Sequence, residues 1–384
     1  MQAAKQLLEL YNLGLNAVKG DNAVYNALMA QGTQESCHVI AIGKAAEAMY
    51  QGVERYLDKD IKSALLISKY GHFSPELLAE RRLIALEAAH PIPAESSLLA
   101  GQTLLHYLKH LPAKEPILFL ISGGASSLCE VLEEGWSLEK LQLATQAKLA
   151  DGASIAEINH MRKQLSKIKG GKLWQFISER PVACLLISDV QTDDPALIGS
   201  GLLFPAPPQR EFTWQIVASN PQMLSAIQAA NVANVVTEIK LMPEFLAGEA
   251  EEEAKSCVEL LKAQPDGIYI WGGETTVKLP ENPECGGRNQ HFALAAAIAL
   301  ENNPEITLLC AATDGTDGVT EDTGALVDGQ TVARGRLENL DPIDCLRRAD
   351  AGTFLAASGD LLHTGPTGTN VMDLVIALKT SCPT

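Results

Sequence analysis

The sequence lacks the short motifs that mark several common enzyme folds. It has no G-x-x-x-x-G-K-[ST], which argues against a P-loop NTPase, and no G-x-G-x-x-G at a strand–helix junction, which argues against a nicotinamide oxidoreductase. It also has no G-x-S-x-G, so an α/β-hydrolase is not expected. No apolar run approaches ~18 residues, the length that a membrane-spanning helix needs. We therefore expect no membrane partner and a ligand site of another kind.

Positive charge is also scarce. Thirty Lys and Arg stand against 47 Asp and Glu, which gives a net charge of −17. Such a surface repels nucleic acid, and a phosphate ligand would need local cations or a metal. The eight cysteines form no C-x-x-C pair and are interpreted as free thiols, and residues 1–10 lack the apolar core of a signal peptide. A cytoplasmic protein is expected.

Short apolar runs alternate with helical patterns along most of the chain. This alternation predicts an α/β fold with a doubly wound parallel sheet, whose ligands bind at the carboxyl ends of the strands. The 384 residues suggest two or three domains. We place the boundary between about 205 and 245 and assign domains to residues 1–235 and 236–384. The expected strands are residues 37–42, 64–68, 83–88, 116–121, 182–187, 214–218, 267–271 and 306–311.

The segment 116–128 contains the most informative loop. A buried strand stops at Ser122, Gly123 and Gly124, and small residues including Ser126 then open a helix. Two glycines let the backbone approach a ligand, and a helix N-terminus attracts an anion. A plain strand-to-helix turn is the simpler explanation for a single loop of this kind. The repetition of the device at Gly272, Gly273, Glu274 and Thr275 favours an anion site.

Charged residues at other strand ends fit the same chemistry. Lys44 follows a strand at a helix start, where the helix dipole disfavours a cation unless an anion lies between them. Asp189 follows another strand, and carboxylates in such a place suit Mg²⁺. The basic segment 158–172 is expected to be a solvated face, with an anion-binding cleft as the alternative. With Lys44 and Arg288 as isolated cations, the loops offer the donors and charges that phosphoryl transfer needs.

This ordered set of loops resembles the glycerate 2-kinase family, whose C-terminal region is called MOFRL and some of whose members were labelled hydroxypyruvate reductases. The resemblance covers nearly the whole chain. It is carried by residues 42–46, 122–124, 159–171, 188–190, 272–276, 287–290, 313–318 and 365–370.

The resemblance implies a flavodoxin-like N-terminal domain, a smaller α/β C-terminal domain with a mixed sheet, and an active site in the cleft between them. The implied reaction converts ATP and D-glycerate to 2-phosphoglycerate and ADP with Mg²⁺. Lys44 and Arg288 match the family's catalytic residues, while Asp189 and Asp314 are assigned metal or base roles. The expected substrate- and phosphate-binding residues are Ser122, Gly123, Gly124, Ser126, Gly272, Gly273, Glu274, Thr275, Asn289, Thr313, Gly315, Thr367 and Asn370.

Four positions depart from the family pattern, and several alternatives stay open. The departures are Ala94, Thr192, Leu202 and His291. One alternative is a hydroxypyruvate or tartronate semialdehyde reductase, which would need a dinucleotide fingerprint. Another is a nucleotide- or hydroxyacid-binding module that has lost turnover. The sequence leaves a homodimer open as the assembly.

Overall fold

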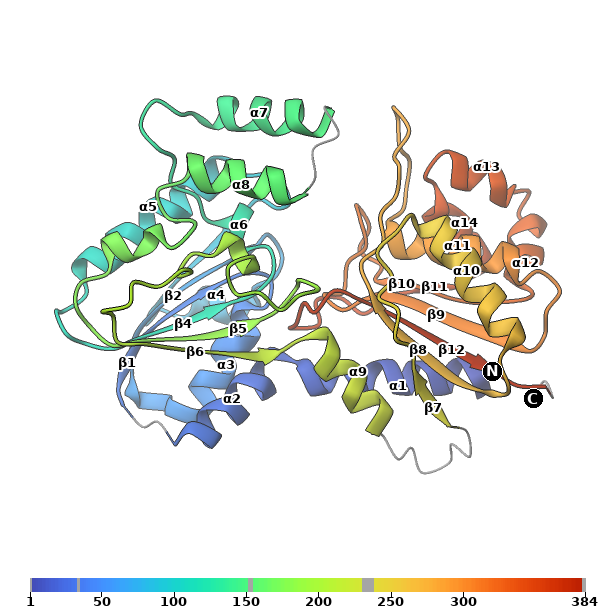
Figure 1. The fold of residues 1–384 in the computed structure, drawn as a ribbon, viewed down its shortest axis with the longest axis horizontal. Helices are drawn as coiled ribbons and strands as arrows, with labels where there is room; N and C mark the ends of the chain where they lie inside the picture. Colours follow the sequence, from blue (N-terminus) through green and yellow to red (C-terminus); the bar gives the residue numbers. More distant parts are fainter. Residues whose placement is uncertain (1, 33–34, 151–154, 230–237, 382–384) are drawn as a thin grey trace. The chain divides into compact units, whose positions relative to one another are not determined.

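The chain folds into two compact units, each built on its own six-stranded sheet (Figure 1). The structure, a computed structural model, describes residues 2–32, 35–150, 155–229 and 238–381. The parallel-sheet unit comprises residues 19–219 and 368–370, and the mixed-sheet unit comprises the remainder of the chain. The predicted domain boundary between residues 235 and 236 lies outside the described residues.

All the strand pairs of the parallel-sheet unit are parallel, in the order β3-β2-β1-β4-β5-β6. The predicted doubly wound sheet is therefore confirmed. Its strands are β1 (Cys37–Ile42), β2 (Ile61–Lys69), β3 (Leu83–Ala88), β4 (Ile117–Ile121), β5 (Val182–Ile187) and β6 (Phe212–Ala218). Because β1 and β4 are neighbours while the chain winds away from them in opposite directions, their carboxyl ends form the switch point of the sheet.

Helices cover both faces of this sheet. Figure 1 shows α2 and α3 on one face and α5, α6 and α8 on the other. The central strands β1 and β4 are buried at every residue, as expected for a strand packed on both sides. The helices are α2 (Gly20–Gln31), α3 (Ala46–Leu57), α4 (Pro75–Ala79), α5 (Glu95–His110), α6 (Ala125–Leu128), α7 (Leu138–Ala150) and α8 (Ile155–Leu165).

The second sheet is mixed, as predicted, with the order β11-β10-β9-β12-β8-β7. Among the strands that the structure describes in this unit, only β7 and β8 pair in parallel. Its strands are β7 (Ile239–Leu241), β8 (Gly267–Gly273), β9 (Ile306–Ala312), β10 (Gly324–Asp328), β11 (Leu361–Leu362) and β12 (Asp373–Lys379). Its helices are α1 (Gln2–Val18), α9 (Asn220–Ala229), α10 (Ala250–Ala263), α11 (Arg288–Ala299), α12 (Thr331–Leu337), α13 (Pro342–Arg347) and α14 (Ala351–Ser358).

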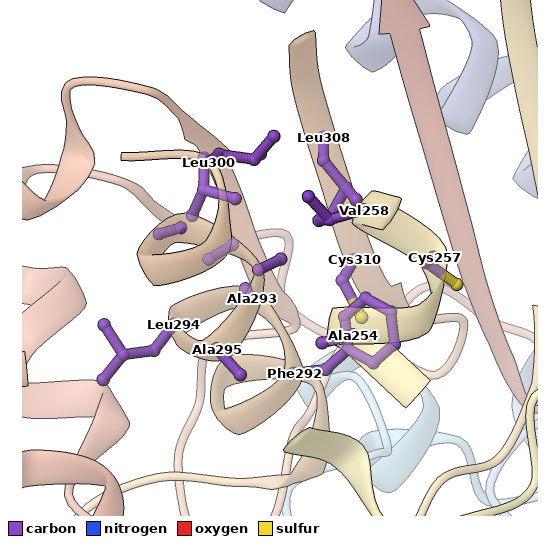
Figure 2. Close-up of a cluster of buried hydrophobic side chains, with 14 of the residues drawn as sticks. Ala254, Cys257, Val258, Phe292, Ala293, Leu294, Ala295, Leu300, Leu308 and Cys310 are labelled. Carbon is purple, nitrogen blue, oxygen red and sulfur yellow. The ribbon is translucent and has the colours of Figure 1, made fainter. Parts of the chain in front are cut away.

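Helix α11 is the buried centre of the mixed-sheet unit. Its alanines allow close packing against α10, and its residues from Asn289 to Ala297 are all buried. Figure 2 shows Phe292 and its neighbours among the side chains of α10 and β9. Helices α1 and α9 cover the opposite face of the sheet. The first residue of α11 is Arg288, so this packed helix fixes the backbone of a candidate catalytic residue.

One cation of the basic segment 158–172 does not lie on the solvated face that its composition predicts. Lys169 is fully buried and forms an ion pair with Glu130, whose side chain is equally buried. Burial lowers the pKa of Lys169, and the neighbouring Glu130 carboxylate opposes this shift. Lys172 binds Glu133 and the carbonyl of Ser166. These cations therefore hold neighbouring loops in place.

Removing one partner of the buried pair should strongly destabilise the protein. Lys169→Met leaves the Glu130 carboxylate buried without its cation, and such changes cost about 3–5 kcal/mol. Urea unfolding followed by circular dichroism measures the loss. The double variant Lys169→Met/Glu130→Leu removes both charges and should recover most of it. A single variant as stable as the wild type would contradict this account of the pair.

Candidate active site

The two loops that leave β1 and β4 contact each other at the switch point of the parallel sheet. The backbone N–H of Lys44 donates to the carbonyl of Gly123 at 2.9 Å, and the N–H of Ala45 donates to Ser122 Oγ at 3.1 Å. Gly43 has a φ of +134°, and a Cβ at this position would overlap Ser122. Glycine is therefore required for this approach, and Lys44 is held beside the predicted anion loop.

Three further polar side chains face the glycines of this loop. A Cβ at Gly123 would lie 2.5 Å from Asp189 Oδ2 and would overlap the Asn370 amide. A Cβ at Gly124 would lie 3.2 Å from His90 Nε2 and 3.3 Å from Lys44 Cγ. The structure thus gathers six of the predicted site residues in one unit: Lys44, Ser122, Gly123, Gly124, Asp189 and Asn370.

Sequence reasoning did not include His90 among the site residues. His90 follows β3 and precedes two prolines. Its position at a strand end of the same sheet is the feature of the sequence that could have indicated a site residue. Ser126, which was predicted, lies in α6, and its hydroxyl is 2.7 Å from that of Ser200. This contact joins α6 to the glycine-rich turn at residues 199–201.

Arg288 is not an isolated cation, contrary to the sequence-based expectation. Its Nε donates to Asp373 Oδ2 at 2.6 Å, its Nη2 donates to Asp373 Oδ1 at 3.0 Å, and its Nη1 lies 3.0 Å from Glu274 Oε1. Burial alone would lower the pKa of Arg288, but the carboxylates of Asp373 and Glu274 raise it above its usual range. Both carboxylates orient the planar guanidinium.

A second unpredicted carboxylate, Asp317, caps the helix that carries Arg288. Its Oδ1 accepts from the N–H of Asn289 at 3.1 Å, and its Oδ2 accepts from the N–H of Gln290 at 2.8 Å. Burial raises the pKa of Asp317 to about 7, and the charge of Asp373 adds to this effect while the two backbone donors oppose it. The glycines before Arg288 indicate in the sequence that a helix starts there. They do not indicate that Asp317, which is distant in the sequence, caps this helix.

Several other predicted binding residues of the mixed-sheet unit are involved in internal packing. A Cβ at Gly272 would overlap Asn220, and one at Gly273 would lie 2.7 Å from Leu246. The Thr313 hydroxyl donates to the carbonyl of Met372 at 2.6 Å. The structure therefore gives these residues a clear structural role, and their contact with a ligand stays a prediction.

The remaining candidates of this unit lie in the segments that follow β8, β9 and β11. Thr367 donates its hydroxyl to the Thr313 carbonyl, and Asp314 Oδ1 accepts from the N–H of Thr316 at 3.1 Å. Gly315 has a φ of +92°, and a side chain there would overlap the Gly365 carbonyl. Thr275 is buried beside the exposed Glu274. Asp314 is nearly buried, in a loop shaped by its own hydrogen bond.

The four departures from the family pattern have separate local surroundings. Ala94 caps α5 without a side-chain hydrogen bond, and its N–H donates to Ser97 Oγ instead. Thr192 is exposed, whereas Leu202 belongs to the apolar core of the parallel-sheet unit. His291 is buried with its Nε2 3.2 Å from Glu251 Oε1, and burial lowers its pKa. His291 therefore lies on α11, as Arg288 does, and its partner Glu251 lies on α10.

Two family models match the chain. Residues 6–239 match a domain of unknown function called DUF4147, and residues 267–373 match the MOFRL family. Together with the two sheets, these matches define a two-domain α/β protein of the MOFRL class. No helix in the described part of the chain is long and apolar enough to cross a membrane.

Comparison with individual proteins narrows this class. The chain is 34% identical to a D-glycerate 2-kinase of Thermotoga maritima over 97% of this chain and 98% of that protein. It is 33% identical to a glycerate 2-kinase of Pyrococcus horikoshii over 97% and 94%. A crystal structure of glycerate kinase from Thermotoga maritima matches with a TM-score of 0.84 and 32% identity, covering 98% of this chain and 99% of that one. The chain belongs to the glycerate 2-kinase family, as predicted.

The raised pKa of Asp317 predicts a specific pH dependence of stability. Between about pH 4 and pH 7 an unfolded Asp has lost its proton, while folded Asp317 keeps it. The folded state then binds more protons, so raising the pH favours unfolding. The free energy of unfolding of the wild type relative to Asp317→Asn should fall across this window by at most about 4 kcal/mol.

Urea unfolding of both proteins at several pH values measures this difference. Asp341→Asn, which alters an exposed acid of the same unit whose side chain caps α13 by accepting from the N–H of Asp344, separates a change at a helix cap from the titration of Asp317. A difference between the wild type and Asp317→Asn that stays constant from pH 4 to pH 7 would show that folded Asp317 titrates like an exposed carboxyl.

Proposed function

We propose that the protein transfers the γ-phosphoryl group of ATP to the 2-hydroxyl of D-glycerate, giving 2-phosphoglycerate and ADP. Family membership over nearly the full chain supports this assignment. The observation that carries it in the structure is Lys44, held beside the Ser122–Gly124 loop at the switch point between β1 and β4. A cation and a glycine-rich loop at this point of a doubly wound sheet suit a phosphate-bearing ligand.

In this proposal Lys44 and Arg288 have different roles. Lys44 stabilises the negative charge that develops on the transferred phosphoryl group. The peptide groups of residues 123–125 position that phosphoryl group. Arg288, oriented by Asp373 and Glu274, offers its remaining N–H donors, at most two, to a phosphate or the glycerate carboxylate. Asp189 is the proposed base for the 2-hydroxyl or a ligand to a metal.

Mg²⁺ is the proposed cofactor. Within the described residues, no three His, Cys, Asp or Glu side chains form a ready-made metal cage. Mg²⁺ in phosphoryl-transfer enzymes is held by one or two carboxylates, waters and substrate phosphates, so a single strand-end carboxylate fits it. Asp189, whose Oδ2 faces Gly123, or Asp314 would hold the ion. When bound, the ion neutralises phosphate charge.

The cytoplasm is the proposed compartment. Seven cysteines within the described residues are free thiols, and most are buried. Unpaired cysteines in this number are typical of proteins kept in a reducing environment. Burial raises the pKa of Cys310, Cys129 and Cys184, so these thiols are protonated and unreactive at neutral pH.

A coupled assay with purified protein, Mg²⁺, ATP and D-glycerate tests the function, with the product identified as 2-phosphoglycerate. The Lys44→Ala variant should lower kcat on the order of 10²–10³-fold while remaining folded, because it removes charge stabilisation of the transition state. Lys59→Ala removes an exposed lysine and serves as the matched control.

Other outcomes of this assay would contradict the proposal. NADH oxidation with hydroxypyruvate or tartronate semialdehyde, without phosphoryl transfer, would identify a reductase. A thermal shift with ATP or glycerate but no turnover would identify a binding module. Wild-type kinetics in Lys44→Ala would exclude this lysine from the reaction.

Arg288→Lys should lower kcat/KM by about a hundredfold, because a single ammonium cannot replace a fork oriented by two carboxylates. Thermal unfolding measured in parallel shows whether the variant is folded. Asp373→Asn keeps the arginine but removes one charge that orients it, so its loss of activity should be smaller. Full activity of folded Arg288→Lys would limit Arg288 to a structural role.

A further inference from the structure

A largely apolar cavity of about 340 Å³ lies beside Arg288 in the mixed-sheet unit. Its walls come from the segment after β8, the residues before α11, the β9–β10 loop and the turn before α14. Glu284, Arg288 and His291 supply polar groups to the lining, and the Glu284 carboxylate is paired with Arg348. The apolar lining residues are Val277, Leu279, Pro283, Val319, Ala349 and Ala351.

Two of the apolar side chains in this lining are largely exposed to solvent. The residue Leu279 is 66% exposed and Val319 is 83% exposed. A single exposed apolar side chain is common in soluble proteins, but these two come from different loops and line the same cavity. A flat apolar ligand in the cavity would cover both of them and gain the free energy of burying their surface.

The walls of the cavity are fixed by close backbone packing. A Cβ at Gly318 would overlap the Gly286 carbonyl and lie 2.7 Å from the Gly287 Cα. Asp317, next to Gly318, accepts two backbone hydrogen bonds from the start of α11. The loop before α11 and the loop after β9 are therefore joined, so the cavity is formed before a ligand arrives.

We propose that this cavity binds the base and ribose of the nucleoside triphosphate donor, an inference that rests on the proposed function. Arg288 lines the cavity and carries the cationic fork, so a nucleotide with its base in the cavity has a cation beside its phosphates. Glycerate is a small anion without an apolar face and gains nothing from these walls. The cavity therefore determines the specificity for the donor, and its exposed side chains Leu279 and Val319 contact the base.

The test uses Leu279→Ser, Val319→Ser and the double variant in the full chain. Because both side chains are exposed, the variants should fold like the wild type. The double variant should raise the Kd for ADP, measured by calorimetry, and the KM for ATP by about tenfold. The KM for D-glycerate and kcat should change by less than about twofold. Leu337→Ser, which alters an 81% exposed leucine at the end of α12 outside the cavity lining, is the matched control.

Inorganic tripolyphosphate distinguishes the base from the phosphates. Its binding should be equal in the wild type and the double variant, because it has no group to place in the cavity. Unchanged ADP affinity in the double variant, or equal weakening of ADP and tripolyphosphate, would overturn the inference. If the variants lose ADP binding but even the wild type forms no 2-phosphoglycerate, the cavity assignment stands and the proposed function fails. If the double variant forms 2-phosphoglycerate with an unchanged KM for ATP, the proposed function stands and the cavity assignment fails.

Discussion

The approach of the β1 loop to the β4 loop is the constraint on which the candidate site of the parallel-sheet unit depends. The two strands are neighbours in register, so their loops leave the sheet at the same edge. They can meet only because Gly43 has no side chain where Ser122 lies. The same contact places the backbone of Lys44 beside Gly123 and its side chain beside Gly124. A lysine at a helix start, unfavourable by itself, is thereby tied to a loop that can bring an anion to it.

In the mixed-sheet unit the corresponding constraint is the buried start of α11. The alanine-rich helix packs against α10 and β9, and Asp317 satisfies its first backbone donors. Arg288 is the first residue of this anchored turn. The β12 strand, which lies between β8 and β9, supplies Asp373 at its first residue. The orientation of the arginine thus depends on the assembly of the whole sheet.

The sequence predicted the parts of the fold that depend on local pattern. The strands β1 to β6 and β8 to β9 are apolar runs ended by small residues, so their positions could be read directly. Asp373, which orients Arg288, could not be predicted, because it lies 85 positions away and begins a strand whose apolar residues suggest only core. The buried partner of Lys169 lies 39 positions away. Local composition identifies a charged residue, but only the tertiary fold selects its distant partner.

The charge around Arg288 restricts what this residue can contribute to phosphoryl transfer. A guanidinium has five N–H donors, and three of them are directed at Asp373 and Glu274. At most two remain for a ligand, and the two carboxylates already offset the positive charge. Arg288 therefore contributes direction more than net charge. In a protein of net charge −17 the phosphates of a nucleotide need further positive charge, which is why the proposed function gives the charge stabilisation to Lys44 and a divalent cation.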